Sequence, residues 1–125
     1  CRLDAPLRVA DGLTHTQYIQ KAFEDELKGG RVISSTNPPI SLQGHVRHLE
    51  FSTTLFGTGG SWDIWFVLTS SNGSQLYLDE HYKFDTGYLA TEACRNAAEA
   101  FSRAVQNLVG QAFSHADFST LLAPR

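Results

Sequence analysis

The segment SWDIWFVLTSSNGSQLYLDEHYKF, residues 61–84, decides the fold of this chain. Its centre is Asn72-Gly73, a dipeptide that favours the tight turn of a β-hairpin. On either side of it, apolar and polar residues alternate with the two-residue period of a strand. The sequence therefore predicts antiparallel strands over residues 61–69 and 75–84. One face of the first strand is expected to carry Trp62, Ile64, Phe66 and Leu68, and the other face Trp65 and Val67.

A longer extended segment, residues 40–54, precedes the hairpin and changes its pattern midway. Even-numbered positions carry its apolar residues as far as Val46, and odd-numbered positions carry them from Leu49 onward. Since one extra residue swaps the two faces of a strand, we expect a bulge or a strong bend near His48. The glycine-rich residues 57–60 then predict a flexible connection to the hairpin.

Two helices are expected, one on each side of the strands. The first runs over residues 15–28, where Thr14 and Gln17 form a capping box and Gly29-Gly30 end the helix. The second runs over residues 91–112, and its inward stripe comprises Cys94, Ala97, Ala98, Phe101, Val105, Leu108 and Ala112. After it, a short turn leads to a last apolar cluster of Phe118, Leu121 and Leu122.

Short β-prone runs at residues 7–11 and 31–35 add further strands to this pattern. Hairpin-linked strands flanked by helices indicate an α+β domain, because the helices cover the apolar side of the sheet. We expect a two-layer sandwich, with an antiparallel or mixed sheet of four to five strands and two helices packed on one face. Residues 1–6 are expected to form a tether, and residues 7–125 a single domain.

The composition excludes some classes of function. The chain has 125 residues, of which 42% are hydrophobic, and a formal net charge of −3. Its basic residues are scattered, so we expect no nucleic-acid binding, which needs clustered Lys and Arg. No apolar stretch reaches the roughly 18 residues that span a bilayer.

The first residue, Cys1, predicts the attachment of the protein to a membrane. A chain that starts on cysteine is typical of bacterial lipoproteins, in which signal peptidase leaves a cysteine that carries acyl chains such as palmitate. The alternatives are a chain end that falls on cysteine by chance, and a disulfide with Cys94, the only other cysteine. If Cys1 is lipidated, its sulfur is already used, and Cys94 is then free or pairs between molecules.

Few residues form patterns typical of catalysis or metal binding. His45 and His48 are three positions apart and point to opposite faces of a regular strand, so only the expected bulge brings them together. Zinc also needs a third and a fourth ligand, and we predict no metal site. The chain has no nucleophile elbow and no phosphate-binding loop, and Cys94 lies in mid-helix. We therefore predict neither an enzyme nor a cofactor.

Glu80 is the carboxylate whose place in the alternation points inward, between Leu78 and Tyr82. A buried carboxylate must be paired or protonated, and such groups cluster at functional sites. The interpretation we favour is a bulge or edge position, where Glu80 reaches solvent or pairs with Arg47. An enzyme centred on Glu80 and the histidines requires these groups to meet in one cleft.

The face of the sheet away from the helices is the expected interaction surface. Exposed aromatic side chains on an uncovered sheet often mark a binding surface. The residues expected there are Trp65, Val67, Tyr77, His45 and His81. The alternative is that another part of the chain covers these side chains.

The arrangement resembles a family of small lipoproteins from the envelope of Gram-negative bacteria, the YajG and transport-auxiliary (PqiC-like) type. The resemblance rests on Cys1, on the helix that ends in Leu27-Lys28-Gly29-Gly30, on the strands from Gly44 to Phe84, and on the alanine-rich residues 93–108. It is also similar in arrangement to the N-terminal domain of TolB and to the activator lipoproteins of penicillin-binding proteins. The resemblance implies a non-catalytic adaptor, and Arg2 after the cysteine implies the periplasmic face of the outer membrane.

We therefore expect a lipid-anchored accessory protein that acts by protein–protein contact in an envelope assembly or transport system. Its partners are expected to be other envelope proteins, with association between copies of the chain left open. A second hypothesis is a module that binds a lipid or a peptidoglycan fragment between helices and sheet. A cavity lined by Trp62, Phe66 and Phe101 would favour that hypothesis.

Overall fold

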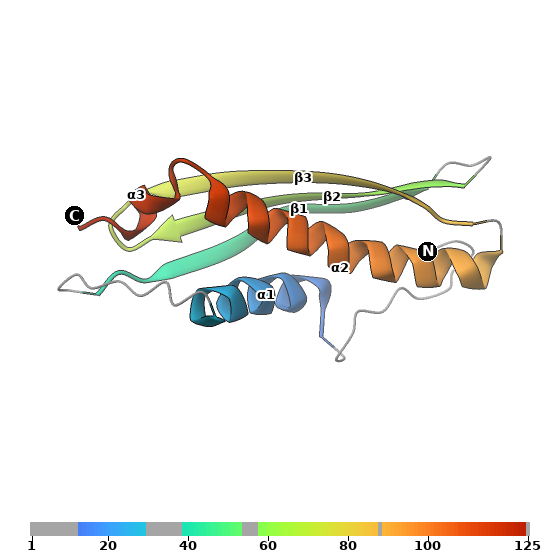
Figure 1. Ribbon diagram of the computed structural model, residues 1–125, viewed down its shortest axis with the longest axis horizontal. Helices are drawn as coiled ribbons and strands as arrows, with labels where there is room; N and C mark the ends of the chain where they lie inside the picture. The colour runs from blue at the N-terminus through green and yellow to red at the C-terminus, as the bar shows by residue number, and fades with distance from the viewer. Residues whose placement is uncertain (1–12, 30–38, 54–57, 88, 125) are drawn as a thin grey trace.

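The computed structural model describes residues 13–29, 39–53, 58–87 and 89–124. Within these ranges the chain forms three helices and three strands (Figure 1). They are α1 His15–Gly29, β1 Leu42–Thr53, β2 Gly59–Ser70, β3 Gln75–Asp85, α2 Ala90–Ser114 and α3 Phe118–Leu122. The expected tether and the expected strands at residues 7–11 and 31–35 lie outside the described residues.

The three strands form one antiparallel sheet in the order β1-β2-β3. This confirms the α+β class and the antiparallel pairing. Over the described ranges the sheet has three strands, fewer than the four to five expected. In Figure 1 the long helix α2 extends along the sheet and the shorter α1 lies near β1, and α2 makes most of its sheet contacts with β3.

The hairpin between β2 and β3 forms where the sequence predicts it. Gly73 has a positive φ of 94°, a conformation that glycine adopts without steric cost. Asn72 also holds the turn from its side chain, since its Oδ1 accepts a bond from the Ser74 amide at 2.8 Å. Its Nδ2 donates to the carbonyls of Thr120 and Ala123, both at 2.8 Å, which ties α3 and the residue after it to the hairpin.

The bulge expected near His48 is confirmed. β1 and β2 change register between Val46 and His48, so that Arg47 is the extra residue. Before the bulge Val46 pairs with Phe66, and after it Leu49 pairs with Ile64. Both apolar halves of β1 therefore lie on the same side of the sheet, as the change of parity in the sequence requires.

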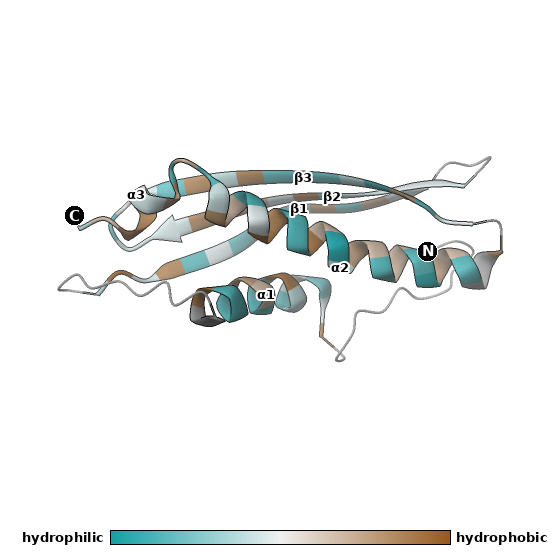
Figure 2. Cartoon of the chain, in the orientation of Figure 1, coloured by the Kyte–Doolittle hydropathy of each residue, from teal (hydrophilic) through white to brown (hydrophobic). Residues whose placement is uncertain are grey.

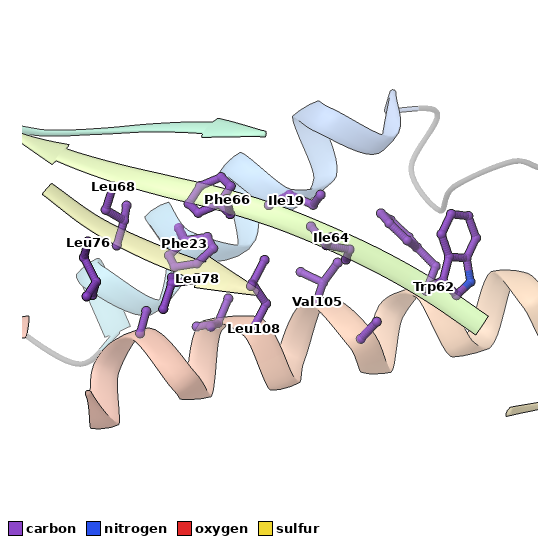
Figure 3. Close-up of a cluster of buried hydrophobic side chains, with 14 of the residues drawn as sticks. Ile19, Phe23, Trp62, Ile64, Phe66, Leu68, Leu76, Leu78, Val105 and Leu108 are labelled. Carbon is purple, nitrogen blue, oxygen red and sulfur yellow. The ribbon is translucent and has the colours of Figure 1, made fainter. Parts of the chain in front are cut away.

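One hydrophobic core contains buried side chains of the sheet and of the helices. Figure 3 shows side chains of α1, β2 and α2 pointing toward one another. Phe23 of α1 stacks on Phe66 with ring centroids 4.5 Å apart, and Trp62 Nε1 donates to the Ala97 carbonyl of α2 at 2.8 Å. In Figure 2 hydrophobic and hydrophilic bands alternate along the strands, which matches one buried and one exposed face.

The start of α1 also follows the prediction. The Thr14 amide donates to Gln17 Oε1 at 2.9 Å, and the Gln17 amide donates to Thr14 Oγ1 at 3.1 Å. These two bonds are the capping box, which satisfies backbone amides that the helix leaves free.

The glycines before β2 were expected in a flexible connection, and this was wrong for two of them. Gly59 and Gly60 belong to β2 and pair with Asp85 and Phe84 of β3. A Cβ atom on Gly60 would lie 2.6 Å from Thr86 Cγ2 and 2.8 Å from the Phe84 ring. The close approach of these two side chains therefore explains the glycine here, and residue composition alone does not reveal it.

Candidate functional site

The outward side chains of β1, β2 and β3 form a surface that we call the open face. Cross-strand pairing arranges it in rows, one residue from each strand in the order β1, β2, β3. The central three rows are His45–Val67–Tyr77, His48–Trp65–Asp79 and Glu50–Asp63–His81. Trp65 is 43% exposed and Tyr77 is 57% exposed, so these two of the expected surface residues do reach solvent.

The bulge brings two consecutive residues of β1 against these aromatic rings. The Arg47 guanidinium carbon lies 5.0 Å from the centre of the Tyr77 ring, within the range of a cation–π contact. The His48 ring lies 4.6 Å from Trp65. Because both come from the irregular step in β1, the bulge supplies each exposed aromatic ring with a nitrogen-bearing neighbour. The sequence analysis identified the bulge and missed these contacts.

Val67 differs from the other expected surface residues. It points to the open face but is only 8% exposed. Its cross-strand neighbours are His45 and Tyr77, whose larger side chains flank it on both sides. Val67 was expected to be accessible, and this was wrong because neighbouring side chains cover it.

Two histidine–carboxylate pairs lie at one end of the open face. Glu50 and Asp63 are directly opposite each other on β1 and β2, an arrangement in which like charges destabilise a sheet. Each carboxylate has a histidine beside it. His48 Nε2 lies 3.1 Å from Glu50 Oε2, and His81 Nδ1 lies 2.5 Å from Asp63 Oδ1. The histidines provide hydrogen bonds that offset this repulsion, and they add positive charge when protonated.

The bulge also decides where the expected histidine pair points. His45 pairs with Val67 and His48 with Trp65, so both histidines lie on the open face despite a spacing of three. Across the part of the chain that the structure describes, no group of three His, Cys, Asp or Glu side chains has an arrangement that could hold a metal ion.

Glu80 lies on the other side of the sheet and is 8% exposed. The Gln111 side-chain amide donates to its Oε1 at 2.6 Å, and the Asn107 amide donates to its Oε2 at 3.2 Å. The favoured pairing of Glu80 with Arg47 was wrong, because Arg47 lies on the open face. The carboxylate instead links β3 to α2, and it does not meet His45, His48 or His81.

His15 is the titratable group with the most unusual surroundings. Its ring contacts Trp62 and Phe101, with centroid distances of 5.6 and 4.8 Å. Its Nε2 is buried and has no hydrogen-bond partner among the residues that the structure describes. Burial lowers the pKa of His15 below its ordinary value, because the charged ring loses its hydration.

Cys94 lies on α2, partly buried, and is disulfide-bonded, whereas a reduced buried thiol was one of the expectations. Cys1, the other cysteine of the chain, lies outside the described residues. A sulfur that carries a lipid thioether cannot also form a disulfide. Lipidation of Cys1 and a bond between Cys1 and Cys94 are therefore mutually exclusive. None of the described helices is long and apolar enough to cross a bilayer.

A depression of about 380 Å³ lies at the β1–β2 loop end of the sheet. Its polar lining includes Ser52, Ser61, His81 and Lys83, and Phe84 supplies an aromatic wall. The cavity expected for the second hypothesis was to be lined by Trp62, Phe66 and Phe101. Those three rings are almost fully buried, and each packs against another aromatic ring.

Comparison with known proteins returned no family model, no curated protein and no solved structure that matches this chain.

Proposed function

We propose that this chain is a non-catalytic accessory protein of the bacterial envelope that binds another protein through its open face. The observation that carries the proposal is the exposure of Trp65 and Tyr77 on one sheet face, each beside a basic or imidazole side chain of β1. Trp, Tyr and Arg are the residues most enriched at the energetic centres of protein interfaces. The contacts restrict the aromatic rings, so less conformational entropy is lost when a partner binds.

The proposal takes α1 and α2 to cover one face of the sheet and to leave the other free. Support comes from the inward residues of β2, since Phe66 stacks on Phe23 of α1 and Trp62 bonds to Ala97 of α2. We further propose that the segments at residues 7–11 and 31–35 extend the sheet to four or five strands.

The anchor is a second part of the proposal and rests on the sequence. A lipid on Cys1 holds the domain at the periplasmic face of the outer membrane, as in the YajG and PqiC-like lipoproteins that the sequence resembles. This anchor requires that the disulfide of Cys94 is not formed with Cys1. Intact mass spectrometry of the native protein tests it, because acyl chains add mass and a disulfide between Cys1 and Cys94 removes two hydrogens. Detection of that disulfide excludes the anchor at Cys1 and leaves the binding function unaffected.

Photo-crosslinking in intact cells tests the binding function. A photoreactive phenylalanine analogue at Tyr77 is expected to capture a distinct envelope protein, because this side chain stands at the proposed contact. The matched control places the analogue at Arg103, an exposed residue of α2. Loss of the adduct on Trp65→Ala supports the proposal. Equal capture from positions 77 and 103 contradicts it.

A second candidate function is the binding of a small polar ligand in the depression beside Lys83. Hydroxyl groups of Ser52 and Ser61 and the Lys83 ammonium line it, and its volume of about 380 Å³ suits a small ligand. Calorimetric titration with a soluble peptidoglycan fragment is the test. Heat that is lost on Lys83→Ala favours this function, and no heat with the native chain removes it.

A further inference from the structure

We propose that His15 is a pH-sensitive latch, a side chain that holds the first turn of α1 in an aromatic cluster while it is neutral and releases the turn once it is protonated. The inference goes beyond the proposed function, because His15 packs on Trp62, which points away from the open face. The opening is local: residues 14–18 move away, while the rest of α1, the sheet and α2 keep their packing.

His15 belongs to a cluster of rings that come from four elements. Its own ring lies 4.8 Å from Phe101 of α2 and 5.6 Å from Trp62 of β2, measured between ring centroids. Phe51 of β1 packs on Trp62, and Tyr18 of α1 packs on Phe101. Tyr18 is the other titratable member, and its hydroxyl forms a hydrogen bond of 2.8 Å with a serine hydroxyl of α2. The surroundings of the imidazole are therefore mostly apolar, and they suit its neutral form.

The cluster gives one ring nitrogen of His15 nothing to bond with. Nε2 is buried and has no hydrogen-bond partner among the residues that the structure describes. In a neutral imidazole one nitrogen carries no proton, whereas both nitrogens of the protonated ring are donors. A buried donor without an acceptor costs free energy, and a buried charge costs more. Burial accordingly lowers the pKa of His15 below its ordinary value.

The charged residues next to the cluster point away from it. Glu50 of β1 and Asp63 of β2 lie opposite each other on the open face. On α2, Glu99 and Arg103 precede and follow Phe101 by two residues, and both are exposed to solvent. The first turn of α1 contains no acidic residue, and the N-terminal end of a helix disfavours a cation. A proton on the ring therefore meets no carboxylate of the described chain that would stabilise it in place.

The later contacts of α1 allow its first turn to open by itself. Phe23 stacks on Phe66 with ring centroids 4.5 Å apart, and the side-chain amide of Gln20 donates to the Gly44 carbonyl at 3.2 Å. Both contacts lie at least one turn beyond His15 and do not involve its ring. They hold the second half of the helix against the sheet when the first turn leaves.

Proton linkage sets the size of the expected effect. A released ring of His15 takes up its proton near the ordinary value of 6.5, and the packed ring takes it up only at lower pH. Between these two values the open form binds a proton that the packed form does not, so a fall in pH favours the opening. From about pH 8 to about pH 5 we expect the opening equilibrium to rise by at least about threefold, and by at most about thirtyfold, which is the limit for one proton.

Hydrogen exchange of single amides across this pH range, corrected for the intrinsic exchange rate, tests the inference. The Tyr18 amide donates to the Thr14 carbonyl at 2.9 Å and reports the first turn, whereas the Phe66 amide of β2 reports unfolding of the domain. We expect the Tyr18 amide to be the less protected of the two and to open more often as the pH falls. His15→Phe keeps an aromatic ring that cannot be protonated, and it is expected to remove this pH dependence. The matched control, His115→Gln at the exposed residue after α2, is expected to keep it.

Three results overturn the inference. The first is equal protection of the Tyr18 and Phe66 amides at every pH, which means that the turn opens only when the whole domain unfolds. The second is a pH dependence that persists in His15→Phe. The third is an NMR titration of the His15 ring with a midpoint at or above 6.5. If circular dichroism shows that His15→Phe unfolds the domain, His15→Leu replaces it and must remove the dependence in the same way.

Discussion

The two tryptophans of β2 lie three residues apart and show how one strand serves two purposes. Trp62 faces the helices, is 2% exposed and donates its indole N–H to α2. Trp65 faces the opposite way, is 43% exposed and contacts His48. Each tryptophan has a histidine neighbour, since His15 packs on Trp62. A histidine packed on a tryptophan therefore stabilises the core on one face of β2, and the same combination is open to solvent on the other face.

The largest expected effect separates these two side chains directly. Trp62→Ala removes a buried indole together with its hydrogen bond, and we expect it to lower the free energy of unfolding by about 3–5 kcal/mol. Trp65→Ala removes a half-exposed ring and is expected to cost about 1 kcal/mol or less. Urea denaturation of both variants checks the prediction. Equal losses would mean that the two faces are equally buried in solution.

Glu80 and Asp79 extend the comparison to adjacent carboxylates on opposite faces. Glu80→Ala leaves the amides of Asn107 and Gln111 without their acceptor, and we expect a loss of about 1–3 kcal/mol. Asp79→Ala, on the open face, is expected to change stability by less than about 0.5 kcal/mol. The triple variant Glu80→Leu, Asn107→Leu and Gln111→Leu leaves no unpaired polar group, so its free energy of unfolding is expected to return most of the way to the native value. Failure to recover this stability would show that the polar link is not the source of the effect.

The capping box tests how firmly α1 is held beside the core. Thr14→Ala removes the oxygen that accepts from the Gln17 amide, and we expect a loss of about 1 kcal/mol. Thr16→Ala, two residues further along the exposed side of the same helix, is the matched control and is expected to have little effect. Hydrogen exchange of the amides of α1 should report the difference, and equal exchange in both variants would contradict it.

The smallest expected effect concerns pH. Burial lowers the pKa of His15 in the folded chain, while the unfolded chain takes up the proton near the ordinary value of 6.5. The unfolded state therefore binds more protons as the pH falls below that value, so His15 reduces stability in acid and has no such effect well above it. As the pH falls from about 8 to about 5, the free energy of unfolding of His15→Phe is expected to rise relative to that of the native chain. Urea denaturation at each pH measures this difference.

Tyr18→Phe provides the control for this pH series. It removes the hydroxyl that forms a hydrogen bond with Ser102 Oγ at 2.8 Å. Tyr18 packs on the ring of Phe101, as His15 does, and the substitution changes no charge. Its effect on stability is expected to be the same at each pH in the series. A His15→Phe difference that is equally flat would mean that the ring of His15 is solvated in the folded chain.

Local patterns predicted the elements whose causes are local. The Thr14–Gln17 capping box, the Asn72-Gly73 turn and the bulge marked by the change of parity after Val46 all follow from residues close together in the chain. The exposure of Trp65 follows from alternation alone. Each of these features needs only the geometry of one helix end, one turn or one strand.

Features that depend on contacts between distant residues were missed. The two side-chain amides that donate to Glu80 come from 27 and 31 residues further along the chain, on α2. Burial of Val67 depends on the sizes of its neighbours on two other strands, and Gly60 is explained by the close approach of Thr86 and Phe84. Glu80 was expected to pair with Arg47 because the sequence does not reveal that Asn107 and Gln111 of α2 lie beside this carboxylate.

Arg47 also makes β1 unusually tolerant of one change in chain length. Deleting this residue would leave Val46 opposite Phe66 and His48 opposite Trp65 in a regular strand, and Leu49 and Phe51 would keep their side of the sheet. The deletion would remove the contact between Arg47 and Tyr77 and leave the register intact. By contrast, deleting a residue of the regular strand β2 would turn the residues beyond it to the wrong face. A library of single-codon deletions, scored for folding, would reveal that asymmetry.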